Sequence, residues 1–90
     1  MPTVHIPTPL RSATGGDATV DIDGATVDEV LHALVDEYPD LKANLYTDDG
    51  TLRQFVNIYA GDDDIRYRDG VDTELADDED LSIVPSIAGG

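Results

Sequence analysis

One segment of this 90-residue chain has the pattern of an amphipathic helix, and this segment limits the folds that the chain can adopt. Positions three and four residues apart share one face of a helix, so an apolar stripe at that spacing must pack against another layer. Thr26 and Glu29 form a capping-box pattern. In this pattern the Thr26 hydroxyl accepts a hydrogen bond from a backbone N–H, and the Glu29 carboxylate accepts one from the N–H of Thr26. Pro39 ends the helix. The stripe consists of Val27, Val30, Leu31, Leu34, Val35 and Tyr38.

The other apolar segments are short and rich in β-branched residues, which is typical of strands. They predict strands at residues 3–6, 18–22, 55–59, 65–67 and 81–85, with a helical turn at 41–45. The first two strands can pair as a hairpin with a long loop that ends at the turn signal of Gly15 and Gly16. Five strands and one main helix indicate an α+β layer with the helix across a mixed sheet. This order alone leaves the topology open, although a ferredoxin-like fold would need a second helix.

The charge of the chain excludes two classes of partner. Lys and Arg number 5 against 20 Asp and Glu, which gives a formal net charge of −15. Nucleic acids and anionic membranes are both recognised through Lys and Arg, so we expect neither as a partner. A surface of this kind repels other copies of itself at low salt, which favours a monomer. The even spread of acidic residues suggests a halophilic host, where salt screens this repulsion.

Covalent and metal chemistry through thiols is excluded, because the chain contains no cysteine. His5 and His32 are expected on exposed faces, and two isolated histidines do not make a zinc site. Residues 62–64 hold three aspartates, but Arg66 follows where a calcium loop needs an oxygen ligand. We read these aspartates as a charged turn and residues 77–80 as a solvated acidic loop. No apolar run is long enough for a membrane span and the N-terminus does not resemble a signal peptide, so we expect a cytoplasmic protein.

The C-terminal sequence is the feature with the clearest chemistry. After the last predicted strand, the chain continues as SIAGG and ends at Gly90. Two terminal glycines leave no side chains beside the carboxylate and permit backbone conformations closed to other residues. Such an end can enter a narrow channel in another protein and reach an ATP phosphate there. Adenylation would make the Gly90 carbonyl an electrophile for a sulfur donor, a cysteine or a lysine.

Five segments together resemble the MoaD/ThiS family of ubiquitin-like sulfur carriers. They are residues 6–11 (IPTPLR), 15–16 (GG), 55–59 (FVNIY), 63–66 (DDIR) and 83–90 (IVPSIAGG), in family order over nearly the whole chain. Within the family, the resemblance is strongest to carriers of bacterial cysteine synthesis and to archaeal small modifier proteins. The resemblance implies a ubiquitin-like β-grasp fold, with the first and last strands adjacent and parallel at the sheet centre.

The resemblance also implies a function and a partner. Gly90 would be adenylated by a ubiquitin-activating-type enzyme that uses ATP, with Gly89 as its required neighbour, and the chain itself would bind no cofactor. The product would be a thiocarboxylate for a sulfur-accepting biosynthetic enzyme, so the chain is a carrier rather than an enzyme. One alternative is a protein modifier that forms an isopeptide bond with target lysines. Another is an acidic interaction domain with an inert tail.

Three further expectations follow from this interpretation. Residues 1–85 form the β-grasp domain, and residues 86–90 form a flexible tail. The candidate contacts with the activating enzyme are Val84, Pro85 and Ile87. In a salt-rich cell the charges are screened, so we expect apolar side chains to hold the two proteins together. Lys42 is the only lysine, so any self-conjugation through a side chain must use it.

The charge of −15 predicts that salt stabilises the fold. We expect the melting temperature to rise as potassium chloride screens the repulsion between carboxylates, whose range shortens to about 3 Å at 1 M salt. Circular dichroism at increasing salt measures this, with an uncharged osmolyte as the control. A melting temperature that does not change with salt would contradict the interpretation.

Overall fold

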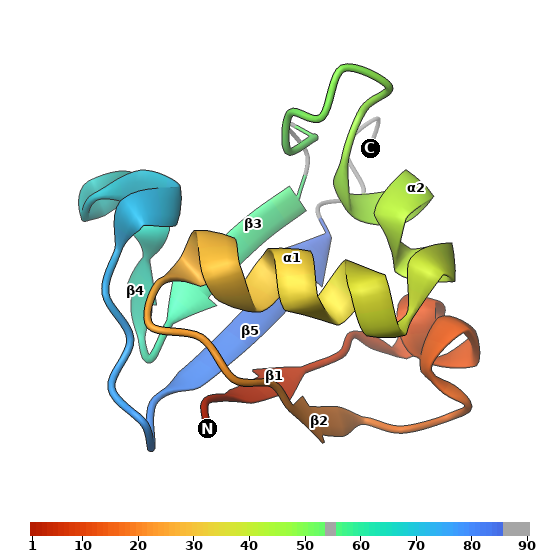
Figure 1. Cartoon of the computed structure of the whole chain (residues 1–90), viewed down its shortest axis with the longest axis horizontal. Coiled ribbons are helices and arrows are strands. Elements are labelled where there is room, and N and C mark those ends of the chain that lie inside the picture. Colours follow the sequence, from red (N-terminus) through yellow and green to blue (C-terminus); the bar gives the residue numbers. More distant parts are fainter. Residues whose placement is uncertain (54–55, 86–90) are drawn as a thin grey trace.

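The computed structural model describes residues 1–53 and 56–85, which form a five-stranded sheet crossed on one face by a helix (Figure 1). The helices are α1 (Val27–Glu37) and the short α2 (Lys42–Leu45). The sheet order is β2-β1-β5-β3-β4. This arrangement is a β-grasp fold, so the predicted α+β class and the mixed sheet with one main helix are confirmed. The strands are β1 (Thr3–His5), β2 (Thr19–Asp21), β3 (Val56–Ala60), β4 (Asp63–Asp64) and β5 (Asp80–Pro85).

The last strand, β5, lies at the centre of the sheet between β1 and β3 (Figure 1). It runs parallel to β1, with Val4 opposite Leu81, and antiparallel to β3, with Ile58 opposite Ile83. All four of these side chains are buried against α1 or the loops beside it. The adjacent and parallel first and last strands implied by the family resemblance are therefore present.

The apolar stripe of α1 packs on this inner face of the sheet as predicted. Its five positions from Val27 to Val35 are buried, while Tyr38, just beyond the helix, is half-buried. The helix ends at Glu37 because Pro39 starts a 3-10 turn, and the N–H of Tyr38 closes the last turn on the carbonyl of Leu34 at 2.8 Å. Burial of this stripe against the sheet provides the hydrophobic core.

The N-terminus of α1 is capped, with one difference from the predicted pattern. The Thr26 hydroxyl accepts a hydrogen bond from the N–H of Glu29 at 3.2 Å, as expected. The Glu29 carboxylate, however, accepts from the N–H of Ala25 at 3.2 Å and not from that of Thr26. Thr26 also forms an isolated bridge with Glu74, in which the N–H of Val27 donates to the carbonyl of Thr73 at 3.0 Å and the N–H of Leu75 donates to that of Ala25 at 2.8 Å.

The connection from β1 to β2 contains a 3-10 helix, Thr8–Thr14, that the sequence analysis treated as a loop. Proline holds φ near the helical value and suits the start of such a turn, which explains why Pro7 and Pro9 precede and open it. The Thr14 hydroxyl bonds to the carbonyls of Arg11 at 3.1 Å and Asp17 at 2.9 Å. Gly15 follows with φ of 69°, which agrees with the predicted turn.

The strand predicted at residues 65–67 is wrong. The antiparallel strand after β3 is only the pair Asp63–Asp64, and Ile65–Tyr67 is a 3-10 helix. Asp64 caps this helix by accepting from the N–H of Arg66 at 2.9 Å, which turns the chain away from the sheet. Asp80 is likewise part of β5 rather than of the acidic loop, since it pairs with Thr3. Phe55, predicted in the third strand, lies outside the described residues.

Removal of the helix cap is expected to destabilise the fold. Thr26→Ala deletes the oxygen that accepts from the N–H of Glu29 and should lower the free energy of unfolding by about 1 kcal/mol. Thr26→Ser keeps that oxygen and serves as the matched control. Urea denaturation at constant salt measures both variants, and equal stability of Thr26→Ala and the wild type would contradict the role of the cap.

Candidate functional site

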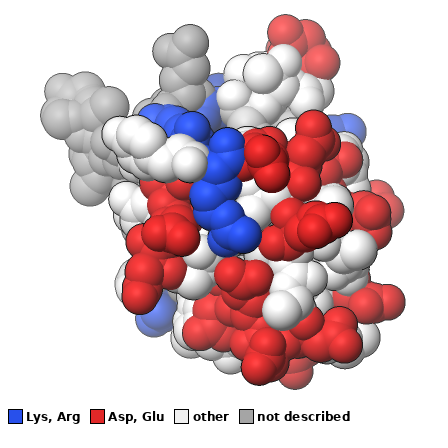
Figure 2. Space-filling model, turned by 90° about the vertical axis from the view of Figure 1, so that its left-hand side faces the viewer, with Lys and Arg blue, Asp and Glu red and all other residues white. Residues whose placement is uncertain are grey.

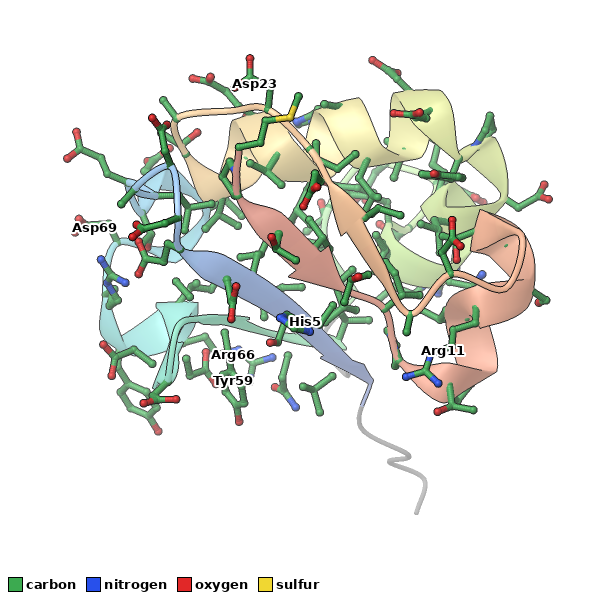
Figure 3. All side chains as sticks on the ribbon, turned by 90° about the horizontal axis from the view of Figure 1, so that it is seen from below. His5, Arg11, Asp23, Tyr59, Arg66 and Asp69 are labelled. Atoms are coloured by element: carbon green, nitrogen blue, oxygen red, sulfur yellow. The ribbon has the colours of Figure 1, made fainter. Side chains whose placement is uncertain are left out.

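One face of the sheet is left open, because α1 covers only the other. The outward positions of the three central strands are Thr3, His5, Asn57, Tyr59, Ser82 and Val84, which alternate with the buried residues of each strand. Figure 3 shows His5 and Tyr59 on the side of the sheet opposite α1. Val84 is the apolar exception among these residues, with 40% of its surface exposed. The open face is therefore polar, with one exposed apolar side chain near the end of β5.

The final strand is held on both sides before the chain leaves the sheet. β1 pairs with β5 as far as Ser82, and β3 continues the pairing as far as Pro85, which stands opposite Val56. Of the residues predicted to contact an activating enzyme, Val84 and Pro85 are thus at the end of an anchored strand. Ile87, Gly89 and Gly90 lie outside the described residues, as does the predicted tail, residues 86–90.

Each histidine lies close to one carboxylate. His5 Nε2 lies 3.3 Å from Asp80 Oδ2 on the open face, and His32 Nδ1 lies 3.2 Å from Asp28 Oδ1 one turn earlier in α1. Both histidines are exposed, as expected. Within residues 1–53 and 56–85, no group of three or more acidic or histidine side chains is arranged to hold a metal ion. None of the helices in these residues has the length and apolar character needed to cross a membrane.

Lys42 lies apart from the open face, beside a small cavity of about 220 Å³. Its side chain is exposed at the start of α2, and His32, Asp36 and Tyr46 line the same cavity. The rings of His32 and Tyr46 stack with their centroids 5.8 Å apart. The only lysine is therefore accessible, as a conjugation acceptor must be, but the described residues do not bring it to the end of β5.

The sequence analysis did not identify Tyr46, whose side chain is buried. The Tyr46 hydroxyl is buried and has no hydrogen-bond partner among the described residues. Burial raises the pKa of Tyr46 above 10.0, and the nearby negative charge of Asp28 raises it further. Tyr46 directly follows the predicted helical turn, but the sequence gives no means of telling a buried hydroxyl from an exposed one.

Comparisons with known proteins agree on one family. A family model described as the ThiS family matches residues 4–90. The sulfur carrier protein CysO of Mycobacterium tuberculosis is 40% identical over 90 residues, which cover 98% of this chain and 97% of that protein. A chain in the crystal structure of the Amycolatopsis orientalis BexX/CysO complex matches with a TM-score of 0.89 and 39% identity, with both chains covered completely. The solution structure of small archaeal modifier protein 1 from Methanosarcina acetivorans matches with a TM-score of 0.86 and 30% identity, and the match covers 98% of this chain and 94% of that one.

The buried hydroxyl of Tyr46 gives a prediction about pH. Since an unpartnered buried hydroxyl costs free energy, Tyr46→Phe should raise the free energy of unfolding by about 1 kcal/mol at neutral pH. The pKa of Tyr46 is higher in the folded state than in the unfolded state, where it is about 10.0. As the pH rises above 10.0, the tyrosine ionises first in the unfolded state and stabilises it, so the free energy of unfolding of the wild type falls. The advantage of Tyr46→Phe should therefore be constant below that pH and grow above it. Urea denaturation across this pH range measures the difference, with the exposed Tyr67→Phe as control. A less stable Tyr46→Phe would contradict this account.

Proposed function

The chain belongs to the ThiS family of sulfur carriers, and from this premise we propose that it carries sulfur on the carboxyl group of Gly90. The family consists of carriers rather than catalysts, so the chemistry is performed on this chain by other proteins. A ubiquitin-activating-type enzyme would join the Gly90 carboxylate to the α-phosphate of ATP with release of pyrophosphate. A hydrosulfide-equivalent donor would then attack the carbonyl, expel AMP and leave a thiocarboxylate.

The placement of β5 is the observation that supports this proposal. The strand that leads to the C-terminus is paired on one side through Ser82 and on the other through Pro85. A partner that binds the sheet therefore meets the root of the tail at a fixed position. We propose residues 1–85 as the domain and residues 86–90, which follow β5, as a flexible tail.

The composition of the tail suits the same chemistry. The chain has no thiol, so sulfur carried covalently in a transferable form must be attached to a carboxyl group. Gly89 and Gly90 add no side chain around the reacting carbon, which allows the end of the chain to enter a narrow active site. We assign no bound cofactor to the chain, since ATP belongs to the activating enzyme in this proposal.

We propose that partners recognise the end of β5 through apolar contacts. Val84 is exposed at 40% on the open face, and Pro85 and Ile87 follow it along the chain. At high salt the charge of −15 contributes little to long-range steering, so contact-range apolar burial must supply the specificity. CysO, a relative of this chain, forms a complex with BexX, and we propose that this chain likewise binds a protein that receives its sulfur.

Similarity to a small archaeal modifier protein favours a second candidate function. In that case a lysine amine would attack the Gly90 adenylate or a thioester derived from it, and an isopeptide bond would replace the thiocarboxylate. Both functions share the activated carboxyl group, so one chain can serve both. Lys42 is exposed and is the only lysine, which makes it the side chain through which copies of this protein would join.

Mass spectrometry of the C-terminus tests the proposal. We expect protein purified from its host under denaturing conditions to carry one oxygen replaced by sulfur at Gly90, while a variant without Gly89 and Gly90 folds normally and carries none. Gly90 joined to lysines, Lys42 of another copy included, would establish the modifier instead.

The control for this experiment is addition of ATP and sulfide to host lysate, which supplies both substrates of activation. If every C-terminus remained a plain carboxylate under these conditions, the carrier function would be contradicted. The chain would then be the acidic interaction domain with an inert tail.

A further inference from the structure

Three aspartates of this chain are each followed by glycine, a pair of residues that is prone to rearrange. The backbone nitrogen of the glycine can attack the side-chain carboxyl carbon of the aspartate, because glycine has no side chain to shield that nitrogen. The product is a succinimide ring, which opens to isoaspartate. The pairs are Asp23–Gly24, Asp49–Gly50 and Asp69–Gly70.

Exposure does not rank the three pairs, since all three aspartates are exposed. Figure 3 shows Asp23 and Asp69 at different edges of the molecule. Figure 2 shows the side on which the 3-10 turns of residues 65–72 and the start of α1 lie, where many Asp and Glu side chains stand in solvent. The order of reactivity must therefore come from the contacts of each pair.

Ring closure needs freedom at three groups of the pair. The carboxyl group must turn toward the glycine nitrogen, the glycine N–H must be free to lose its proton, and the aspartate carbonyl must rotate with the peptide plane. A hydrogen bond at any of these groups has to break in a local opening first. Each such bond should therefore slow the reaction about fivefold.

The pair Asp49–Gly50 is held at two of these groups. The N–H of Thr51 donates to Asp49 Oδ1 at 3.2 Å, and the Thr47 hydroxyl bonds to the same oxygen. The N–H of Gly50 donates to the carbonyl of Thr47 at 3.0 Å. The hydrogen bond from Thr47, followed by those from Thr51, also lowers the pKa of Asp49, which disfavours the protonated carboxyl group that reacts. This pair is the most protected of the three.

The pair Asp69–Gly70 is held at one group. Its aspartate carbonyl accepts from the N–H of Asp72 at 3.1 Å, and this bond must break when the peptide plane rotates. The N–H of Asp69 donates to Thr73 Oγ1 at 3.1 Å, and Thr73 is fully buried, so the turn is fixed from beneath. The Asp69 carboxylate does not cap the 3-10 turn that follows. This pair is intermediate.

The pair Asp23–Gly24 is held at none of the three groups. Backbone hydrogen bonds stop at Ile22, whose N–H donates to the carbonyl of Pro2 at 3.0 Å, and they resume at Ala25. Within residues 1–53 and 56–85, no hydrogen bond or ion pair involves Asp23 or Gly24. Both the carboxyl group and the peptide plane of this pair can therefore turn without breaking a contact of this kind.

Packing explains why glycine follows Asp23. A Cβ at position 24 would lie 2.7 Å from Val30 Cγ2 and 2.9 Å from the backbone nitrogen of Val30. Atoms in a close-packed interior do not approach to such distances, so only glycine fits beside the first turns of α1. The fold thus requires at position 24 the residue whose nitrogen is most open to attack on Asp23.

We propose that Asp23–Gly24 is the site at which the folded chain rearranges to isoaspartate, ahead of the other two pairs. The Gly24 nitrogen forms a bond to Asp23 Cγ, and the N–H proton leaves with the carboxyl hydroxyl as water. Water then adds to the main-chain carbonyl carbon of the ring and breaks its bond to the Gly24 nitrogen. The chain now runs through Cβ and Cγ of Asp23, the former main-chain carbonyl is a free carboxylate, and the composition is unchanged. This inference does not rest on the carrier function.

The rearrangement lengthens the backbone between β2 and α1 by one atom. Gly24 is packed against Val30, and the Glu29 carboxylate accepts from the N–H of Ala25 at 3.2 Å. The added atom displaces these contacts at the start of α1. We therefore expect the isoaspartyl form to melt at a lower temperature than the unmodified chain.

Peptide mapping of protein aged in the folded state tests the proposal. The full chain is incubated at neutral pH under conditions where circular dichroism shows it to be folded, and it is then digested with trypsin. Cleavage after Lys and Arg places the three pairs on separate peptides, residues 12–42, 43–53 and 69–90. Electron-transfer fragmentation distinguishes isoaspartate from aspartate at each position. We expect it to form at Asp23 about fivefold faster than at Asp69 and tenfold or more faster than at Asp49.

Ageing of the full chain in guanidinium chloride is the control for intrinsic reactivity. Glycine follows the aspartate in all three pairs, so we expect similar rates once the fold is removed. Asp23→Glu keeps the charge but would need a larger ring, so isoaspartate should disappear from residues 12–42. Asp69→Glu is the matched control and should leave the rate at Asp23 unchanged. Thr47→Val removes the hydroxyl bonded to Asp49 Oδ1 and should raise the rate at Asp49 about fivefold.

Three results would overturn the proposal. These are isoaspartate that appears first at Asp49 or Asp69 in the folded chain, the same ranking of rates with and without the fold, and no isoaspartate at Asp23 when the denatured chain has reacted there. The isoaspartyl form can be separated by anion exchange, because its free carboxylate differs in acidity from that of aspartate. A melting temperature equal to that of the unmodified chain would contradict the displacement at the start of α1.

Discussion

The parallel pairing of β1 with β5 is the contact on which the rest of the structure depends. It brings residues from the two ends of the sequence together at the centre of the sheet, with Val4 opposite Leu81. Both side chains are fully buried beneath α1. A parallel pair cannot be joined by a tight turn, so the intervening chain must cross over, and α1 is part of that crossing. The helix can bury its apolar stripe because β1 and β5 form the floor beneath it.

This pairing also explains how a small carrier can present its C-terminus. Because β5 is internal, its backbone is bonded to neighbours on both sides up to Ser82 and on the β3 side up to Pro85. The domain can therefore remain folded while a partner handles the residues that follow. A C-terminal strand at the edge of the sheet would have half as many backbone bonds to resist the same pull. The central position thus separates the stability of the fold from the chemistry that we propose for Gly90.

Periodicity predicted the elements that the core determines. The helix stripe and the two central strands were found because buried positions repeat at 3.6 or 2 residues. The predictions that were wrong fall where side chains bond to the local backbone. Asp64 caps a 3-10 helix instead of extending a strand, and the Glu29 carboxylate accepts from the N–H of Ala25 instead of that of Thr26. Such choices depend on bonds between polar side chains and the nearby backbone, which hydrophobic patterns do not encode.

Other features of the molecule differ in the same way, because some depend on residue types alone and others on the folded structure. The role proposed for Gly89 and Gly90 came from the sequence alone, because it depends on residue types and not on the fold. The structure also has a cavity of about 580 Å³ beside β3, which the sequence did not predict, because Arg53, Arg66 and Val71 become neighbours only when the sheet and the 3-10 turns have formed.

Arg66 connects a 3-10 turn to the central sheet. Its guanidinium donates to the carbonyl of Val56, and Val56 pairs with Pro85 of β5 on the other side. The outer edge of β3 is thereby covered by a positive side chain, which protects a short sheet edge from pairing with another chain. The same arginine holds a positive charge close to the point where β5 ends.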